Sequence, residues 1–288
     1  MGKLGSQWIK IDMQYNTPDL DDRSKYLRSL VVRGLKGGNR GHVGSSMSPI
    51  EILRVLYDDV MHYDPQNPAM KKRDRCILSK GHGCLALYAL LADKRYFPVE
   101  ELDRFCHRDG ILGGHPEQNK VPGVEASTGA LGHGLSIGVG MALAARMDRR
   151  DSRVFVTMGD GEINEGSVWE AAMCAGKHKL SNLIAIIDYN KIQSAGLTRD
   201  IQDLEPLADK WTSFGFAVEE VDGHNIEALR AVFARTPFNL EKPTAIIAHT
   251  IKGKGIPFAE GDPKWHHHSR FAPEIFQKMN DALGVSNA

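Results

Sequence analysis

Residues 154–161 read Val-Phe-Val-Thr-Met-Gly-Asp-Gly, and this stretch decides the fold. Its first five residues are apolar or β-branched, as in a strand buried on both faces. The run then passes directly into Gly159-Asp160-Gly161, and glycine permits a tight loop that approaches a ligand closely. A second run, Leu183 to Asp188, leads in the same way into Tyr189-Asn190-Lys191-Ile192. The two stretches predict neighbouring buried strands with polar loops at their carboxyl ends.

Similar short runs alternate with helical patterns along the rest of the chain. The expected strands are Arg75 to Ser79, Val154 to Met158, Leu183 to Asp188, Ala217 to Val221 and Thr244 to His249. The expected helices are about Pro18 to Lys36, Ile50 to Val60, Gly83 to Arg95, Leu131 to Arg146, Ser167 to His178, Leu204 to Phe214, Ile226 to Arg235 and Pro273 to Leu283. Buried strands joined by helices imply an α/β fold, a doubly wound, mainly parallel sheet flanked by helices.

Helix-start signals near the N-terminus and the unbroken alternation of strands and helices predict the domain organisation. Thr17-Pro18 and Ser48-Pro49 each combine a capping residue with a proline, which is typical of a helix start. Between these two helices, Gly37 to Met47 is expected to be a flexible glycine-rich loop. With no linker or repeat in the chain, we expect a single domain over residues 1–288 that begins with an N-terminal extension at 1–16.

Composition excludes several classes of protein. The 288 residues carry 36 basic and 36 acidic side chains, so no net charge attracts nucleic acid or an anionic membrane. The apolar runs are far shorter than the roughly 20 residues of a membrane-spanning helix, and Met1 to Lys10 lacks a secretory pattern. The four cysteines have no C-x-x-C spacing, which favours free thiols in a reducing compartment. We expect a cytoplasmic protein that binds neither nucleic acid nor membrane.

The two strand ends predict a metal-diphosphate site. Ligands of open parallel sheets bind beyond the carboxyl ends of the strands, where Asp160 and Asn190 would lie side by side. Carboxylate and amide oxygens suit Mg²⁺, which fills its remaining positions with phosphate oxygens and water. The helix expected from Ser167 would present its N-terminus to an anion. The alternative for either segment alone is an ordinary glycine turn with a capping Asp and a loop Asn.

A set of ordered motifs resembles the transketolase family. Gly161 and Asn190 are separated by 28 residues, a spacing similar to that of the thiamine diphosphate motif. The further matching segments are Gly41-His42 with Met47, Ser79 to Gly83, Gly114 to Glu117, Thr128 to Gly132, Gly159 to Gly166, Asp188 to Ile192, Lys252 to Gly255 and Trp265-His266. The resemblance covers roughly residues 20–285, and many ordered matches are more specific than one motif.

The resemblance implies a role for each matching residue. The implied Mg²⁺ ligands are Asp160, Asn190 and the Ile192 carbonyl, and Gly161 would contact the cofactor diphosphate. The other implied roles are His82 and His266 near the cofactor diphosphate and reacting centre, His42 and His115 at the donor hydroxyl and carbonyl oxygens, Gly129 and Leu131 against the cofactor rings, and Glu165 in a hydrogen-bond relay between active sites at the subunit interface. Histidine suits proton transfer near neutral pH.

The implied activity is transfer of a two-carbon ketol unit from a ketose or ketose phosphate to an aldose or aldose phosphate, with thiamine diphosphate and Mg²⁺ as cofactors. Compared with a full transketolase, the chain stops before the pyrimidine-binding and C-terminal domains. The resemblance therefore implies the N-terminal subunit of a split transketolase, which is inactive without a C-terminal partner subunit. The implied assembly is α2β2. The alternatives are the α subunit of a 2-oxo acid dehydrogenase and a catalytically silent binding subunit. Pentose phosphates and branched or sulfonated sugars all remain possible substrates.

The remaining candidates have simpler interpretations. His62, His107, His178 and His224 are expected to be surface or satisfied core residues, whereas His249 could point into the crevice. His133 stands where the family usually has Gln, and His267 and His268 are either a chance cluster or an adventitious metal site. Lys252 and Lys254 are either solvated loop charges or phosphate ligands. Cys84 and Cys174 are expected to be packing residues.

Overall fold

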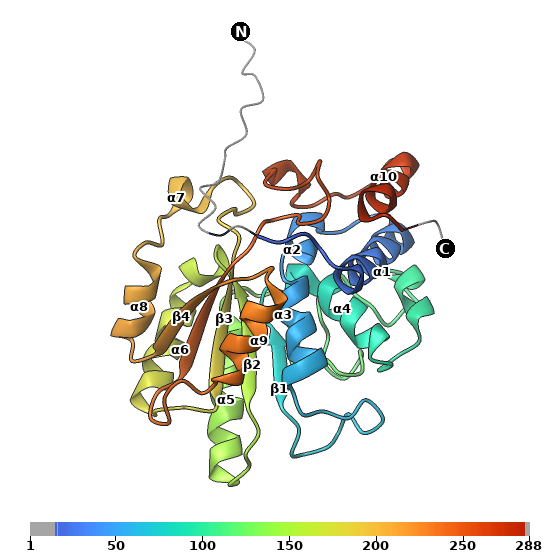
Figure 1. The fold of residues 1–288 in the computed structure, drawn as a ribbon. Coiled ribbons are helices and arrows are strands. Elements are labelled where there is room, and N and C mark those ends of the chain that lie inside the picture. The colour runs from blue at the N-terminus through green and yellow to red at the C-terminus, as the bar shows by residue number, and fades with distance from the viewer. Residues whose placement is uncertain (1–14, 16, 286–288) are drawn as a thin grey trace.

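Five strands of the part of the chain that the structure describes form one parallel sheet (Figure 1). The structure is a computed structural model and describes residue 15 and residues 17–285. The order is β1-β2-β3-β5-β4, with bounds β1 Arg75–Leu78, β2 Val154–Gly159, β3 Leu183–Tyr189, β4 Ala217–Asp222 and β5 Thr244–His249. The predicted strands and the parallel α/β fold are confirmed. Apart from Tyr15, the predicted N-terminal extension, including the segment Met1 to Lys10, lies outside the described residues.

Helices pack on both faces of this sheet. Their bounds are α1 Asp22–Gly38, α2 Val43–Met47, α3 Ile50–Val55, α4 Cys84–Asp93, α5 His133–Met147, α6 Gly166–Lys177, α7 Thr198–Ile201, α8 Leu207–Ser213, α9 Ile226–Ala234 and α10 Pro273–Leu283. Short 3₁₀ turns precede α4 and α6, and a π turn at Leu56–Val60 continues α3. Among the described residues, no helix combines the length and the apolar character needed to cross a membrane.

The central strand β3 shows how the two apolar layers form. Ile184 and Ile186 face the cluster built with α1, α3, α4 and α9, whereas Leu183, Ala185 and Ile187 face the cluster built with α5, α6 and α8. Successive side chains of a strand point to opposite faces, so a continuous apolar run is required here. All seven residues of β3 are buried, which explains why this run lacks the alternation of a half-exposed strand.

The register of β2 and β3 positions the site. Gly159 of β2 pairs with Asp188 of β3, so both strands end at the same edge of the sheet. The loops that follow carry Asp160 and Asn190. The sequence-based expectation that these two side chains lie close together at one edge is confirmed, because both line one cavity.

Two predictions about the N-terminal segment are wrong. The first helix begins at Asp22, not at Thr17-Pro18, because the Asp21 carboxylate accepts a hydrogen bond from the Ser24 N–H at 2.8 Å and caps the helix. The stretch Gly37 to Met47 is not one flexible loop. Its second half is α2, whose five residues are all buried.

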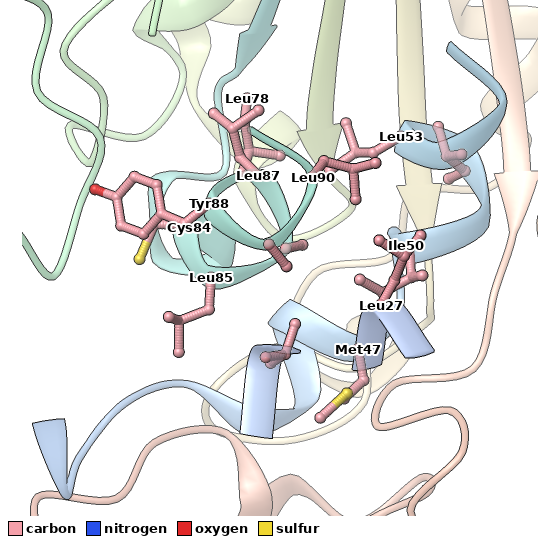
Figure 2. Close-up of a cluster of buried hydrophobic side chains, with 14 of the residues drawn as sticks. Leu27, Met47, Ile50, Leu53, Leu78, Cys84, Leu85, Leu87, Tyr88 and Leu90 are labelled. Carbon is pink, nitrogen blue, oxygen red and sulfur yellow. The ribbon is translucent and has the colours of Figure 1, made fainter. Parts of the chain in front are cut away.

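Apolar packing explains the burial of α2. Met47 lies in a cluster with Leu27 of α1 and Ile50 and Leu53 of α3, and each of these side chains is 0% exposed (Figure 2). Tyr88 and Cys84 of α4 lie in the same cluster (Figure 2). Burial raises the pKa of the Cys84 thiol, in agreement with a packing role. Cys174, by contrast, is only half-buried, against the apolar layer of α5, α6 and α8.

Smaller differences occur at other helix ends. The helix predicted from Leu131 begins at His133 because Gly132 adopts a left-handed conformation with φ of 82°. Helix α8 begins at Leu207 instead of Leu204, and the short helix α7 was not predicted. The C-terminal helix has the predicted bounds, Pro273–Leu283.

The packing predicts which leucines stabilise the fold. Leu53→Ala should lower the free energy of unfolding by about 2–5 kcal/mol because it opens a cavity among fully buried side chains. Leu240 is 81% exposed, so Leu240→Ala should change stability by less than about 0.5 kcal/mol. Urea unfolding of both variants measures the difference, and equal effects would contradict the assigned core.

Candidate functional site

A cavity of about 260 Å³ lies at the carboxyl edge of β2 and β3. Asp160 and Asn190 line it and are buried, at 2% and 3% exposure. Asp160 Oδ1 accepts a hydrogen bond from the Gly161 N–H at 2.7 Å, and Asn190 Oδ1 accepts one from the Ile192 N–H at 3.2 Å. Gly161, Leu131, Gly129 and Ile192 also line this cavity. The carboxylate, the amide oxygen and the Ile192 carbonyl are hard oxygen donors of the kind that Mg²⁺ prefers.

The four histidines singled out from the sequence gather at this cavity. The ring centroid of His42 lies 5.4 Å from that of His82, 6.3 Å from that of His115 and 5.3 Å from that of His266. All four residues line the cavity, and they come from four segments distant in sequence. His115 is exposed, whereas the other three rings are partly buried, so the cluster extends from the cavity interior to its mouth.

Burial controls the protonation of the inner rings. It lowers the pKa of His42 and His266 to about 3, and neighbouring imidazoles and the Lys252 ammonium add to the effect. Burial also holds the pKa of His82 well below its ordinary value. These rings are therefore neutral near pH 7, and each ring has one nitrogen that donates and one that accepts a hydrogen bond. Such rings can contact hydroxyl and carbonyl oxygens of a sugar.

Gly129 shows why glycine is needed in this wall. Its φ is 127°, a conformation that side chains with a Cβ rarely adopt. A Cβ at this position would lie 2.8 Å from Cδ2 of His115. The glycine therefore lets the backbone approach the imidazole directly.

Lys252 lies at the site. From the sequence, its ammonium group could be either a solvated loop charge or a phosphate ligand. The expectation of a solvated loop charge is wrong for this residue, because its side chain is buried and lines the cavity. Its Nζ donates hydrogen bonds to the carbonyl oxygens of Ile192 at 2.9 Å and Gln193 at 3.2 Å. Burial lowers the pKa of the Lys252 ammonium, and the nearby Asp160 carboxylate opposes this shift. Lys254 is only half-buried and does not line the cavity.

A second buried lysine lies beside the first. Lys80 Nζ forms an ion pair with Asp188, whose carboxylate also accepts hydrogen bonds from the hydroxyls of Ser48, at 2.6 Å, and Thr250. Burial and the Asp188 carboxylate together raise the pKa of Asp160. Two carboxylates and two ammonium groups therefore share this buried edge of the sheet.

The loop of Lys252 is fixed by a buried ionic network. Arg28 of α1 binds Glu51 of α3 with its two terminal guanidinium nitrogens, at 2.5 and 2.8 Å, and its Nε donates to the Lys254 carbonyl at 2.7 Å. His224 Nε2 accepts from the Ile251 N–H at 2.8 Å, so its ring proton lies on Nδ1, 2.8 Å from Glu51 Oε2. His224 is thus a satisfied core residue, as predicted.

Glu162 joins three segments that form the cavity wall. Its buried carboxylate accepts hydrogen bonds from the Gly132 N–H and the Gly159 N–H, both at 3.0 Å, and from the Ser79 hydroxyl. These partners lie at the start of α5, at the end of β2 and directly after β1. Glu162 belongs to one of the matching sequence motifs, but the motif gave no reason to assign it a role. Two of its hydrogen-bond partners, Gly132 and Ser79, are distant in sequence, and the folded structure brings all three partners to its carboxylate.

Three buried polar atoms at the cavity have no partner among the described residues. They are Ser45 Oγ, Gln193 Nε2 and His266 Nδ1. An unpaired buried polar atom costs about 1–3 kcal/mol. A polar ligand that supplies acceptors would remove this cost, so these atoms fit a bound diphosphate together with Lys80 and Lys252.

Other sequence candidates lie outside the cavity. His249 does not point into it, because its Nε2 is 2.6 Å from Glu220 Oε2 and its ring lies against Tyr189. Glu165 is exposed at the N-cap of α6 and does not line the cavity. His133 is exposed, with its Nδ1 3.0 Å from the Leu131 carbonyl oxygen. His62, His107 and His178 are exposed, as expected.

The histidines beyond His266 differ from each other in their surroundings. The exposed His267 ring lies 4.5 Å from His42, whereas His268 packs against Trp265 and Phe271. Although these rings cluster, no group of three or more His, Cys, Asp or Glu side chains in the described part of the chain could hold a metal ion. The alternative of an adventitious histidine metal site has no support.

Comparison with known proteins identifies the family. Residues 21–288 match the transketolase thiamine diphosphate-binding domain. The chain belongs to the transketolase family. A relative from Phocaeicola vulgatus, named as one of the subunits of apulose-4-phosphate transketolase, is 44% identical over 255 residues, which cover 88% of this chain and 90% of the relative. A 6-deoxy-6-sulfo-D-fructose transketolase subunit from a Clostridium species is also 44% identical, over 86% of this chain and 90% of its own length.

Longer members of the family share the fold. The transketolase of Pongo abelii is 36% identical over 92% of this chain, which corresponds to only 44% of its own length. The crystal structure of a Pichia stipitis transketolase variant superposes with a TM-score of 0.87 and 31% identity, covering 93% of this chain and 41% of that one. The structure of Leishmania mexicana transketolase gives a TM-score of 0.86 at 33% identity, with coverage of 94% and 42%.

The hydrogen bonds of Glu162 predict a measurable effect on the cavity. In Glu162→Gln, the amide nitrogen must face a backbone N–H or the Ser79 hydroxyl, so at least one buried hydrogen bond is lost. We expect a loss of about 1–3 kcal/mol in unfolding free energy and about tenfold weaker thiamine diphosphate binding. Thermal unfolding and calorimetric titration measure the two effects. The exposed control Glu274→Gln should change neither quantity.

Proposed function

We propose that this chain is the N-terminal subunit of a two-chain transketolase, and that it transfers a two-carbon ketol unit from a ketose phosphate to an aldose phosphate only when a C-terminal partner subunit is bound. The observation that carries the proposal is the cavity where Asp160 and Asn190 lie beside four histidines. The near-complete match to relatives named as transketolase subunits supports it.

The residues at the sheet edge fit the cofactor. Asp160, Asn190 and the Ile192 carbonyl would hold Mg²⁺, and Gly161 would lie against the diphosphate. Lys252 now donates to the Ile192 carbonyl, so metal and ammonium would compete for this oxygen. The unpaired Ser45 and Gln193 atoms would donate to phosphate oxygens. Bound thiamine diphosphate would supply the electron sink for cleavage of the carbon–carbon bond.

The histidines would bind the sugar substrate and exchange hydrogen bonds with its oxygens. We assign His42 and His115 to the hydroxyl and carbonyl oxygens of the donor, where neutral imidazoles both donate and accept hydrogen bonds. His82 and His266 would lie near the cofactor diphosphate and the reacting centre, with Gly129 and Leu131 against the cofactor rings. Glu165, exposed at the N-cap of α6, would join a relay across a subunit interface.

An exposed apolar face on α5 and α6 supports the need for a partner. Ile137, Met147 and Met173 are 37%, 81% and 54% exposed. Gly140 and Gly166 lie on these helices with open space where a Cβ would be, so packing within this chain does not explain these glycines. Glycine inside a helix, such as Gly140 in α5, costs about 1 kcal/mol relative to Ala, and a second chain packed closely there would account for it. We propose an α2β2 assembly in the cytoplasm.

The two relatives with 44% identity carry names that specify particular sugar substrates. The names of the two relatives specify apulose 4-phosphate and a sulfofructose, and both sugars carry an oxyanion at the end remote from the ketol unit. We propose that the donor here is likewise a ketose with a terminal phosphate or sulfonate. Assays with pentose phosphates and with these two sugars discriminate among the candidates.

The metal assignment predicts the effect of changing Asp160. Asp160→Ala should abolish Mg²⁺-dependent binding of thiamine diphosphate because it removes the charged ligand. Asp160→Asn retains an acceptor for the Gly161 N–H, sets its amide nitrogen against the Lys191 N–H and should still weaken binding strongly; thermal unfolding of this variant then separates metal loss from misfolding. Asp151→Ala, an exposed change at the opposite edge of the sheet, is the control. Isothermal titration calorimetry measures the affinity, and an unchanged value in Asp160→Ala counts against the assignment.

The partner requirement predicts a difference between the isolated and the assembled protein. The isolated chain should show almost no ketol transfer, whereas mixing it with the C-terminal subunit should give activity that depends on thiamine diphosphate and Mg²⁺. Full activity of the isolated chain would overturn the two-chain proposal. Decarboxylation of pyruvate by the mixture would instead favour the 2-oxo acid dehydrogenase alternative, and cofactor binding without either reaction would favour a silent binding subunit.

A further inference from the structure

A second cavity lies at the opposite edge of the sheet. It has a volume of about 370 Å³ and is lined by Arg75 and Val154, the first residues of β1 and β2. None of its lining residues belongs to the lining of the candidate active site. The polar groups that line it are Arg73, Arg75, Gln118, Glu125, Arg150 and Ser152. The volume is within the range of about 300–1,000 Å³ that is typical of small-molecule sites.

The charges of this cavity are unbalanced. Three guanidinium groups and one carboxylate line it. Arg73 already binds both oxygens of the Glu125 carboxylate, one of them at 3.0 Å. The nearest acidic oxygen to Arg75 is Glu125 Oε2 at 3.7 Å, which is too far for a hydrogen bond. The cavity therefore has a positive charge that its own carboxylate does not neutralise.

Arg75 has no hydrogen-bond partner for its guanidinium within the described residues, although its side chain is only 19% exposed. Burial lowers the pKa of Arg75, the Glu125 carboxylate opposes this shift, and the charges of Arg73 and Arg150 add to it. Arginine usually meets carboxylates or phosphates with paired hydrogen bonds when it is withdrawn from water. The ion pair with Glu125 leaves the N–H groups of this guanidinium without hydrogen bonds, and a ligand with oxyanion acceptors would supply them.

Two further polar atoms beside Arg75 lack partners. Arg150 Nε and Ser152 Oγ are buried and make no hydrogen bond to a described residue. The other nitrogens of Arg150 bind the Lys71 carbonyl at 3.2 Å and Asp148 at 2.9 Å, which holds its guanidinium in place. A fixed guanidinium, a second guanidinium without hydrogen bonds and a buried hydroxyl are donors of the kind that bind a tetrahedral oxyanion.

We propose that this cavity binds a small oxyanion, a phosphate or the phosphoryl group of a small molecule, through Arg75, Arg150 and Ser152. This inference does not depend on the proposed function, since the site lies at the other edge of the sheet. Met141 and Ala144 of α5 also line the cavity, at the rim of the exposed α5–α6 face. In an assembled enzyme the same donors would therefore accept either a free phosphate or a carboxylate of the associated chain.

The test compares the parent chain with three variants in phosphate and in chloride buffer of equal ionic strength. Arg75→Gln removes the guanidinium that makes no hydrogen bond, and Arg75→Lys retains its charge without the planar fork. Arg149→Gln is a control because Arg149 is exposed and does not line the cavity. Thermal unfolding and calorimetric titration with inorganic phosphate are the measurements. Phosphate bound in the candidate active site would affect all proteins equally, so the difference from the parent chain reports this cavity.

In chloride, Arg75→Gln should unfold within a few degrees of the parent, because it removes both the repulsion with Arg73 and Arg150 and the attraction to Glu125. In phosphate, the parent and Arg149→Gln should be stabilised, whereas Arg75→Gln should bind about tenfold more weakly or not at all. Arg75→Lys should lie between them. A variant Arg75→Gln that is less stable in both buffers and binds phosphate as the parent does would overturn the proposal.

The assembled enzyme distinguishes the two sources of the anion. Phosphate binding at Arg75 that persists in the complex supports a free phosphorylated ligand. If phosphate binds to the isolated chain but not to the complex, a carboxylate of the associated chain occupies the same donors in the complex. If phosphate binding does not depend on Arg75 in either the isolated chain or the complex, the proposed oxyanion site is wrong.

Discussion

The site depends on buried charge at the carboxyl ends of β2 and β3. Asp160 and Asp188 are 2% and 0% exposed, and two carboxylates this close to each other cannot both remain ionised without cations. Lys80 compensates Asp188 directly, and the Lys252 ammonium interacts electrostatically with Asp160. Breaking such a buried pair by removing one partner typically costs about 3–5 kcal/mol, so the arrangement strongly constrains the surrounding loops.

The rest of the site follows from that constraint. The Lys252 loop is held on the core by the network of Arg28, Glu51 and His224, and the opposite wall is held by Glu162. These two supports position loops from distant parts of the sequence around one cavity, and the histidines enter on those loops. Their burial keeps the inner imidazoles neutral, which suits exchange of hydrogen bonds with sugar oxygens.

The sequence predicted the features that depend on local pattern. The strands, and their alternation with helices along the chain, were predicted from short apolar runs. The adjacency of Asp160 and Asn190 was predicted from the rule that successive strands often pair. The gathering of His42, His82, His115 and His266 could be expected only from the family resemblance. The burial of Lys252 and the role of Glu162 were not predictable, because their partners are fixed by tertiary contacts. The helix α2 was missed since its glycine- and serine-rich sequence is stabilised by packing of Met47 on α1 and α3, not by local propensity.

The most direct test of the account is the position of the metal in crystals of this chain grown with thiamine diphosphate and Mn²⁺, located by anomalous scattering. The account predicts one strong peak with Asp160, Asn190 and the Ile192 carbonyl as the protein ligands, and Lys252 moved from that carbonyl to the diphosphate. Bound cofactor with the metal elsewhere, or with Lys252 still on the Ile192 carbonyl and no metal beside Asp160, would contradict it.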